Sequence, residues 1–198
     1  MTPTKTPQNT DLILEVQEDF KSFIEDKMFP CVAAKAALAK EQMDIFVAGH
    51  LACPKDDQDI LDFIYKFVDQ YRASEKDFHT ACVIFPETHP LNEQAFDRLF
   101  WDRLQALSDL DGMNYPYDKR VDQNPASPNF SFSLKEEAFF IIGLFPGSSR
   151  EARKFRYPAI VFNPHEQFEE LRLEIIKEPE KKVFDPIVYT KFGHYSLN

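Results

Sequence analysis

The apolar run from Ala138 to Phe145 constrains the fold of this chain more than any other segment. It lacks the alternation of polar and apolar residues that marks a strand with one solvent-facing side. A continuously apolar strand is typical of a sheet that is buried on both faces. We therefore predict a central strand at these positions, in a sheet flanked by helices.

Strand-like and helix-like segments alternate along the rest of the chain. Short apolar runs predict further strands at 45–48, 81–85 and 159–162. Apolar residues at helical spacing predict helices at 12–24, 60–71 and 96–107, and alanine-rich 32–40 predicts another. The expected fold is one domain over 1–198, of the α/β or α+β class, with a mixed central sheet of about four or five strands.

The periodicity stops between 109 and 133, where asparagines and prolines interrupt the pattern. A surface excursion is expected there, and long ordered loops in compact domains are often functional. The proline-containing stretch 179–186 is expected to be irregular.

Composition excludes several classes of function. The formal charge of −10 disfavours nucleic acid and anionic membranes as partners, because both require a basic surface. The polar start of the chain lacks the apolar core of a signal peptide, and no apolar run reaches membrane-spanning length, so we expect a cytoplasmic protein. Cys31, Cys53 and Cys82 form no Cys-x-x-Cys pair, which predicts free thiols rather than disulfides or structural zinc.

His165 is the leading candidate for a ligand to a metal or haem. Asn163 suits a helix N-cap and Pro164 the first helical position. Glu166 lies three residues after the cap, which completes the spacing of a capping box. His165 would then lie in the first turn of a helix whose apolar face carries Phe168, Leu171 and Ile175. The positive end of the helix dipole favours a neutral imidazole, the form that binds iron or zinc. A core histidine that donates one hydrogen bond is the alternative.

A cluster of basic residues precedes His165. Ser148 and Glu151 have capping-box spacing, so a short helix is expected to place Arg150, Arg153 and Lys154 on one face. With Arg156 they concentrate positive charge in an acidic chain, which favours binding of carboxylates or phosphates, including haem propionates. A solvated basic surface is the alternative.

Cys31 is a second candidate ligand. It follows Phe29-Pro30 at a predicted helix start, where a thiol pKa can be lowered, although a lone cysteine among apolar residues is usually a small buried hydrophobe. The sequence contains no HExxH, Gly-x-Ser-x-Gly, Gly-x-Gly-x-x-Gly or phosphate-loop pattern. The common zinc hydrolase, serine hydrolase and dinucleotide-binding functions therefore have no support.

The sequence resembles the YqcI/YcgG family over most of its length. The resemblance rests on Phe29-Pro30-Cys31, the segment 96–111 with Trp101, Phe130-Ser131-Phe132-Ser133 and the block 139–172. Its most specific parts are Ser149-Arg150-x-x-Arg153-Lys154-Phe155 and Phe162-Asn163-Pro164-His165-x-Gln167-Phe168-Glu169. The chain departs from the family near its end, where Asp185-Pro186 and Phe192-Gly193 only echo a longer closing motif, so substrate identity carries over least.

Characterised members of this family are haem-dependent oxygenases, among them N-hydroxylases of arginine-like guanidines in natural-product pathways. The resemblance implies haem b, with His165 as axial iron ligand and Arg150, Arg153 and Lys154 near the propionates. It also implies a small cationic amine or guanidine substrate, and either peroxide or dioxygen with an external reductase as the source of oxidant. A homodimer is one expected assembly.

Two alternatives remain open at this point. A haem carrier or sensor would use the same residues to hold the cofactor without turning over a substrate. A domain without any cofactor would use His165 only for packing.

Overall fold

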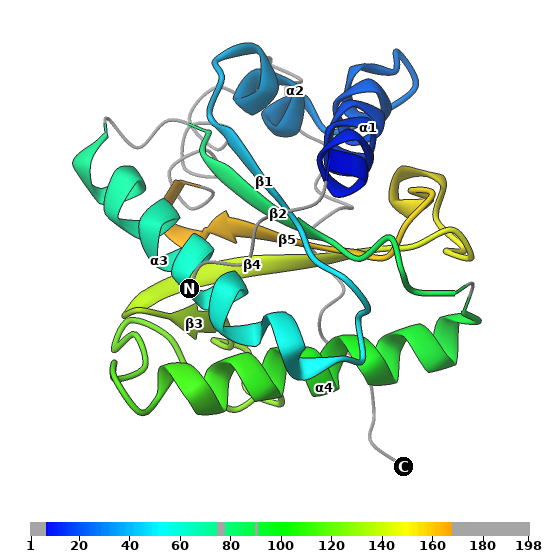
Figure 1. The fold of residues 1–198 in the computed structure, drawn as a ribbon. Coiled ribbons are helices and arrows are strands. Elements are labelled where there is room, and N and C mark those ends of the chain that lie inside the picture. Colours follow the sequence, from blue (N-terminus) through cyan, green and yellow to red (C-terminus); the bar gives the residue numbers. More distant parts are fainter. Residues whose placement is uncertain (1–6, 75–77, 90, 168–198) are drawn as a thin grey trace.

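A five-stranded mixed sheet forms the centre of the computed structural model, which describes residues 7–74, 78–89 and 91–167 (Figure 1). The strands are β1 (Met43–Val47), β2 (Thr80–Ile84), β3 (Phe132–Leu134), β4 (Glu137–Leu144) and β5 (Ala159–Pro164). Their order is β1-β2-β5-β4-β3, with β1 and β2 parallel and the other neighbours antiparallel. The expected mixed sheet flanked by helices is confirmed.

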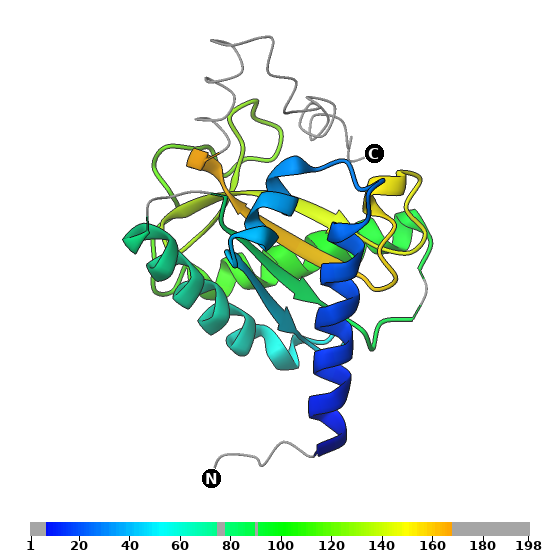
Figure 2. The same cartoon turned by 90° about the horizontal axis from the view of Figure 1, so that it is seen from above.

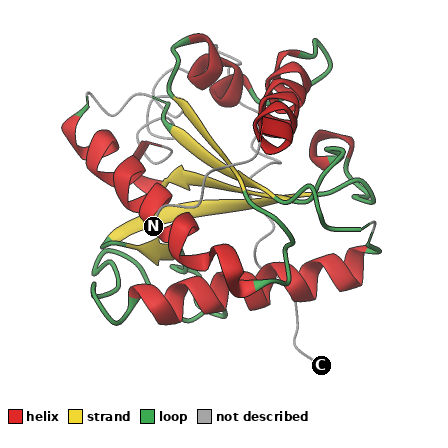
Figure 3. Cartoon of the chain, viewed as in Figure 1, coloured by secondary structure: helices red, strands yellow, loops and turns green. Residues whose placement is uncertain are grey.

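Helices cover both faces of the sheet, as Figure 3 shows by element type. The helices are α1 (Pro7–Glu25), α2 (Val32–Ala39), α3 (Asp57–Ala73) and α4 (Glu93–Asp111), with the 3-10 turns η1 (Pro54–Asp56) and η2 (Glu151–Arg153). Helices α1 and α2 lie on one face, and α3 and α4 lie on the other (Figures 1 and 2). Each of the four helices overlaps a segment that the sequence predicts as helical.

Two apolar cores lie between the sheet and the helices, one on each face of the sheet. The larger core packs α3 and α4 against side chains such as Val83, Ile160 and Phe162. The smaller core packs Val16 and Phe20 of α1 against the opposite face of the same strands. All five residues of β2 are buried, as expected for an inner strand covered on both sides.

The apolar run at 138–145 forms an inner strand, although not the middle one. Strand β4 lies between β5 and β3, and β5 occupies the centre of the sheet. The prediction of a buried strand is confirmed, and its placement at the centre is wrong. Strand order depends on pairings between distant segments, which the apolar pattern of one strand does not encode.

The predicted excursion at 109–133 is shorter than expected. Helix α4 continues to Asp111, and β3 occupies the last part of the segment. Strand β3 and β4 form a hairpin through Lys135 and Glu136, which have positive φ values of 51° and 55°. Two such residues are typical of a tight hairpin turn, where glycine or asparagine is usually found. Within the described ranges, no helix has the length and apolar character needed to cross a membrane.

Candidate ligand-binding site

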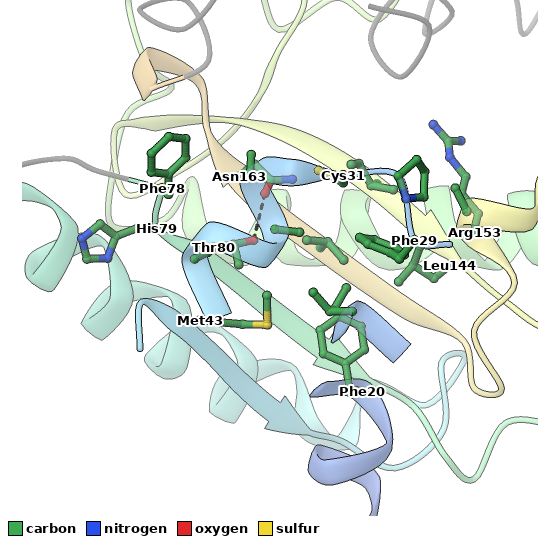
Figure 4. A pocket seen from close by; sticks show the side chains of 18 of the residues that line it. Phe20, Phe29, Cys31, Met43, Phe78, His79, Thr80, Leu144, Arg153 and Asn163 are labelled. Carbon is green, nitrogen blue, oxygen red and sulfur yellow. Dashed lines mark hydrogen bonds between the residues drawn. The ribbon is translucent and has the colours of Figure 1, made fainter. Parts of the chain in front are cut away.

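A cavity of about 620 Å³ lies on the α1/α2 side of the sheet (Figure 4). Its walls are mainly apolar, and strands β4 and β5 contribute through Ile142, Leu144 and Val161. Phe20 of α1 and Phe29 of the α1–α2 connection also line it. Cavities of this size and composition are typical of sites for small molecules and cofactors.

Arg150 and Arg153 line one part of the cavity, beside the end of β4. The backbone places them there: Arg153 accepts a hydrogen bond from the Phe145 N–H at 3.0 Å, and Ser148 Oγ accepts one from the Arg150 N–H at 3.2 Å. Arg150 is exposed and Arg153 is half-buried, and together they add positive charge to this end of a mainly apolar wall, which suits a carboxylate.

The other two basic residues of the predicted cluster lie outside the cavity lining. Lys154 forms an ion pair with Glu151, and Arg156 binds Asp19 of α1 at 2.6 Å. The segment forms the 3-10 turn η2, and Arg150 precedes it as the N-cap without a side-chain cap. The prediction of a capped helix with one shared basic face is therefore wrong, because the segment forms a 3-10 turn and only Arg150 and Arg153 of the four cations line the cavity.

Cys31 also lines the cavity, at the N-cap of α2. Burial raises the pKa of its thiol, while the backbone N–H groups of Ala34 and Ala33 and the charge of Lys35 lower it to a smaller extent. The net pKa lies above the ordinary cysteine value. The structure thus favours a neutral thiol over a thiolate at this position.

His165 lies next to the cavity and is not among the described residues that line it. Its imidazole contacts the ring of Phe140, with the centroids 4.4 Å apart. Phe140 is paired with Asn163, and paired residues of antiparallel strands point to the same face. Because Asn163 and Gln167 both line the cavity, His165 lies between two lining residues in the sequence and over the same face of the sheet.

The N-cap predicted before His165 is wrong. Strand β5 extends through Pro164, and a helical turn begins at His165 itself. The Asn163 side chain instead accepts a hydrogen bond from Thr80 Oγ1 at 2.8 Å and donates one to the Phe140 carbonyl at 3.3 Å. Glu166 forms an ion pair with Arg120 at 3.6 Å. The predicted apolar stripe at 168, 171 and 175 lies outside the described residues.

Several lining residues were not singled out from the sequence. Met43, His79 and Thr80 come together where β1 and β2 begin, on the side of the cavity away from Arg153 (Figure 4). The His79 ring packs against Tyr71 at 5.7 Å, and its backbone carbonyl accepts a hydrogen bond from Gln167 Nε2 at 2.7 Å. No motif spacing marks these residues, because parallel pairing of β1 with β2 brings them together.

The described side chains that line the cavity do not form a cluster of metal-ligating groups. Among the residues that the structure describes, no group of three or more His, Cys, Asp or Glu side chains is placed to hold a metal ion. An apolar cavity with two arginines can bind a ligand that has an apolar body and an acidic group.

Comparison with known proteins assigns the chain to a family. The model of the YqcI/YcgG family matches residues 20–187. The chain belongs to the YqcI/YcgG family. The family segment thus includes both arginines, Cys31, His165 and the whole sheet.

Two curated relatives come from Bacillus subtilis (strain 168). The uncharacterized protein YqcI is 25% identical over 152 residues, covering 74% of this chain and 59% of the relative. The uncharacterized protein YcgG is 26% identical over 148 residues, covering 72% of this chain and 57% of the relative. The matched part of this chain therefore spans less than two thirds of either relative. No solved structure matches the chain significantly.

Proposed function

We propose that this YqcI/YcgG chain is a cytoplasmic haem-dependent monooxygenase that N-hydroxylates a small amine or guanidine. The observation that supports it best is the apolar cavity of about 620 Å³ with Arg150 and Arg153 in its wall. The family resemblance suggests haem b as the cofactor and N-oxygenation as the reaction.

The cavity fits the chemical groups of haem. A porphyrin presents a flat apolar body, which the phenylalanine and aliphatic walls match. Its two propionates need cations, and arginine binds carboxylates through two parallel hydrogen bonds. Arg150 and Arg153 are the residues that would hold them.

His165 is the proposed axial ligand, although the cavity wall does not include it. His165 would hold the iron from beside the cavity, where its imidazole contacts the ring of Phe140. His79 belongs to the described wall, but its ring packs against Phe67 and Tyr71 of α3, on the other face of the sheet, so it is not a candidate ligand in this cavity. Cys31 is a weaker candidate, since burial raises the pKa of its thiol and the thiolate is the form that binds iron.

Each part of the site would have a separate role. Bound haem would supply the oxygen-activating chemistry, with peroxide or with dioxygen and electrons from an external reductase. The arginines would orient the cofactor, and the apolar walls would exclude water. Among the described lining residues the only carboxylate is Glu151, which is paired with Lys154. The choice of a cationic substrate therefore rests on the family resemblance.

A haem carrier or sensor is the alternative. It would use the same cavity and arginines but would leave no room for a substrate at the iron. A six-coordinate haem that is insensitive to added amines would favour this alternative over an oxygenase.

Product analysis tests the proposed reaction. The haem-loaded protein is incubated with reductant, isotopically labelled dioxygen, and a panel of amines and arginine analogues. Mass spectrometry is expected to find one labelled oxygen atom in at least one nitrogen-containing product. Absence of label from every product, in protein that holds haem, would refute the oxygenase and favour the carrier.

Charge-matched variants test the propionate site. Arg153→Gln and Lys154→Gln each remove one positive charge from adjacent positions, but only Arg153 lines the cavity. Haem affinity is expected to fall about tenfold in Arg153→Gln, as for loss of a hydrogen-bonded charge pair, and to stay unchanged in Lys154→Gln. Equal losses in both variants would indicate a general effect of charge.

A further inference from the structure

A second polar group lies in the cavity wall, away from the arginines. Thr80 and Asn163 are 4% and 7% exposed, and their side chains are joined by the 2.8 Å hydrogen bond drawn in Figure 4. Gln167, which is 5% exposed, also lines the cavity. A buried polar group without a hydrogen-bond partner costs free energy of folding. Donors and acceptors in this wall that have no partner in the protein are therefore places where a ligand can form hydrogen bonds.

The orientation of the Gln167 amide is fixed by one contact. Nε2 donates to the His79 carbonyl oxygen at 2.7 Å, and a carbonyl can only accept. The other end of the amide, Oε1, is therefore an acceptor. Oε1 is buried and has no hydrogen-bond partner among the residues that the structure describes.

Thr80 and Asn163 provide a further hydrogen-bond acceptor and a donor at the same end of the cavity as Gln167. The single Thr80 hydroxyl proton goes to Asn163 Oδ1, which leaves the hydroxyl oxygen able to accept. Asn163 Nδ2 carries two protons, and the Phe140 carbonyl takes one of them at 3.3 Å. This polar end thus offers acceptors together with one donor, which matches a hydroxyl or a primary amide.

Register gives the separation of the two ends. Leu144 is paired with Ala159, and Asn163 lies four positions further along β5. At about 3.3 Å per residue, the polar end is about 13 Å from the end of β4 where Arg153 is held. Figure 4 shows Arg153 and Leu144 on one side and Thr80, His79 and Asn163 on the other.

We infer that the cavity has two unlike ends and binds a carboxylic acid with an apolar body and a neutral hydroxyl or amide group at its far end. Arg150 and Arg153 bind the carboxylate, and Gln167, Thr80 and Asn163 bind the neutral group. A cation is disfavoured at the polar end because no carboxylate lies among its described lining residues. The inference concerns the haem-free cavity and does not depend on the proposed oxygenase activity.

Calorimetric titration of haem-free protein with matched ligands tests this inference. The probes are ω-hydroxydecanoic acid, decanoic acid without the far hydroxyl, and the methyl ester of ω-hydroxydecanoic acid without the charge. We expect ω-hydroxydecanoic acid to bind about fivefold or more tightly than either of the others. Equal affinity for the hydroxylated and plain acids would overturn the polar subsite, and equal affinity for acid and ester would overturn the arginine subsite.

A variant separates the polar subsite from the rest of the cavity. Gln167→Leu is expected to abolish the preference for the far hydroxyl while keeping the affinity for decanoic acid within about twofold. Gln70→Leu, on the exposed side of α3, makes the same chemical change outside the cavity and is expected to keep the preference. If Gln167→Leu does not fold, the ligand series on the unaltered chain decides the question.

The two proposals fail independently. Haem binding is measured separately by absorption spectroscopy, so a chain that binds the acids but no haem contradicts only the proposed function. A chain that binds haem but none of the acids contradicts only this inference. A haem in the cavity would compete with the acids, and the haem-free protein avoids that interference.

Discussion

The imidazole of His165 lies against the phenyl ring of Phe140, with the two centroids 4.4 Å apart and the planes tilted by 35°. This contact places His165 over the cavity face of the sheet, beyond the edge of the described cavity wall. His165 therefore packs against an aromatic ring and also lies beside the cavity in which we propose that haem binds. Absorption spectra of haem-reconstituted variants distinguish packing from iron ligation.

The reactivity of Cys31 reports on occupation of the cavity. Because burial raises the pKa of its thiol, little thiolate forms at neutral pH, and alkylation is expected to be slow and to accelerate as the pH rises. Cys53 is exposed and should be alkylated first. Mass spectrometry after iodoacetamide treatment measures both rates. A cavity ligand should slow the alkylation of Cys31 and leave that of Cys53 unchanged. Equal protection of both thiols would contradict the position of Cys31 in the cavity wall.

Arg103 is expected to be essential for stability. Its buried guanidinium pairs with Asp57 and donates hydrogen bonds to the backbone carbonyls of Leu51 and Cys53. Arg103→Met leaves a buried carboxylate and these carbonyls without partners, so the free energy of unfolding should fall by about 3–5 kcal/mol. Urea denaturation measures this value.

Exposed Arg98, on the same helix, provides the matched control for Arg103. Arg98→Met should change the free energy of unfolding by less than about 0.5 kcal/mol. Similar losses in the two variants would mean that the buried contacts of Arg103 do not account for its effect.

Gly143 is required by close packing between β4 and α4. A Cβ atom there would lie 2.9 Å from Cε1 of Phe96, whose ring is itself stacked on Phe145. Gly143→Ala is therefore expected to destabilise the fold by about 1–3 kcal/mol. Thermal unfolding of Gly143→Ala with and without Phe96→Leu checks the cause. The second change should recover part of the loss, and no recovery would point to another origin.

The stability of the chain should fall in acid partly through Asp118. Burial raises the pKa of this carboxyl, but hydrogen bonds from Arg120 and the backbone N–H of Ala138 outweigh it and hold the pKa below its usual value. A lowered folded-state pKa gives stability that is present above the unfolded-state pKa of about 4 and is lost as pH falls through the folded value. We expect urea denaturation at a series of pH values to show that the free energy of unfolding falls less steeply with decreasing pH in Asp118→Asn than in the unaltered chain. An unchanged slope would contradict the assignment.

The sequence predicted those elements whose residues carry their own periodic pattern. The stripe of Ile60, Ile64 and Phe67 predicts α3 because helical spacing and burial coincide within one segment. Strand β3 was missed because it has only three residues and its turn uses Lys135 and Glu136 instead of glycine or asparagine. Arg72 donates hydrogen bonds to both turn carbonyls at 2.9 Å, a contribution from a distant helix.

The site was harder to predict because several of its residues are placed by partners that are distant in the sequence. Arg150, Arg153 and Cys31 were found from local charge and helix-start signals, and all three line the cavity. Asn163 was misassigned because its amide binds Thr80, which lies 83 positions away in the sequence. Local capping patterns compete with tertiary partners of this kind, and a single sequence does not reveal which will be satisfied.

The absorption spectrum of haem-reconstituted protein tests the central claim, that this chain binds haem through His165. The unaltered chain is expected to give a Soret band that is lost or shifted in His165→Ala. The band should be retained in His89→Ala, which removes an exposed imidazole. No Soret band in the unaltered chain, an unchanged band in His165→Ala, or a loss confined to His79→Ala would contradict the claim.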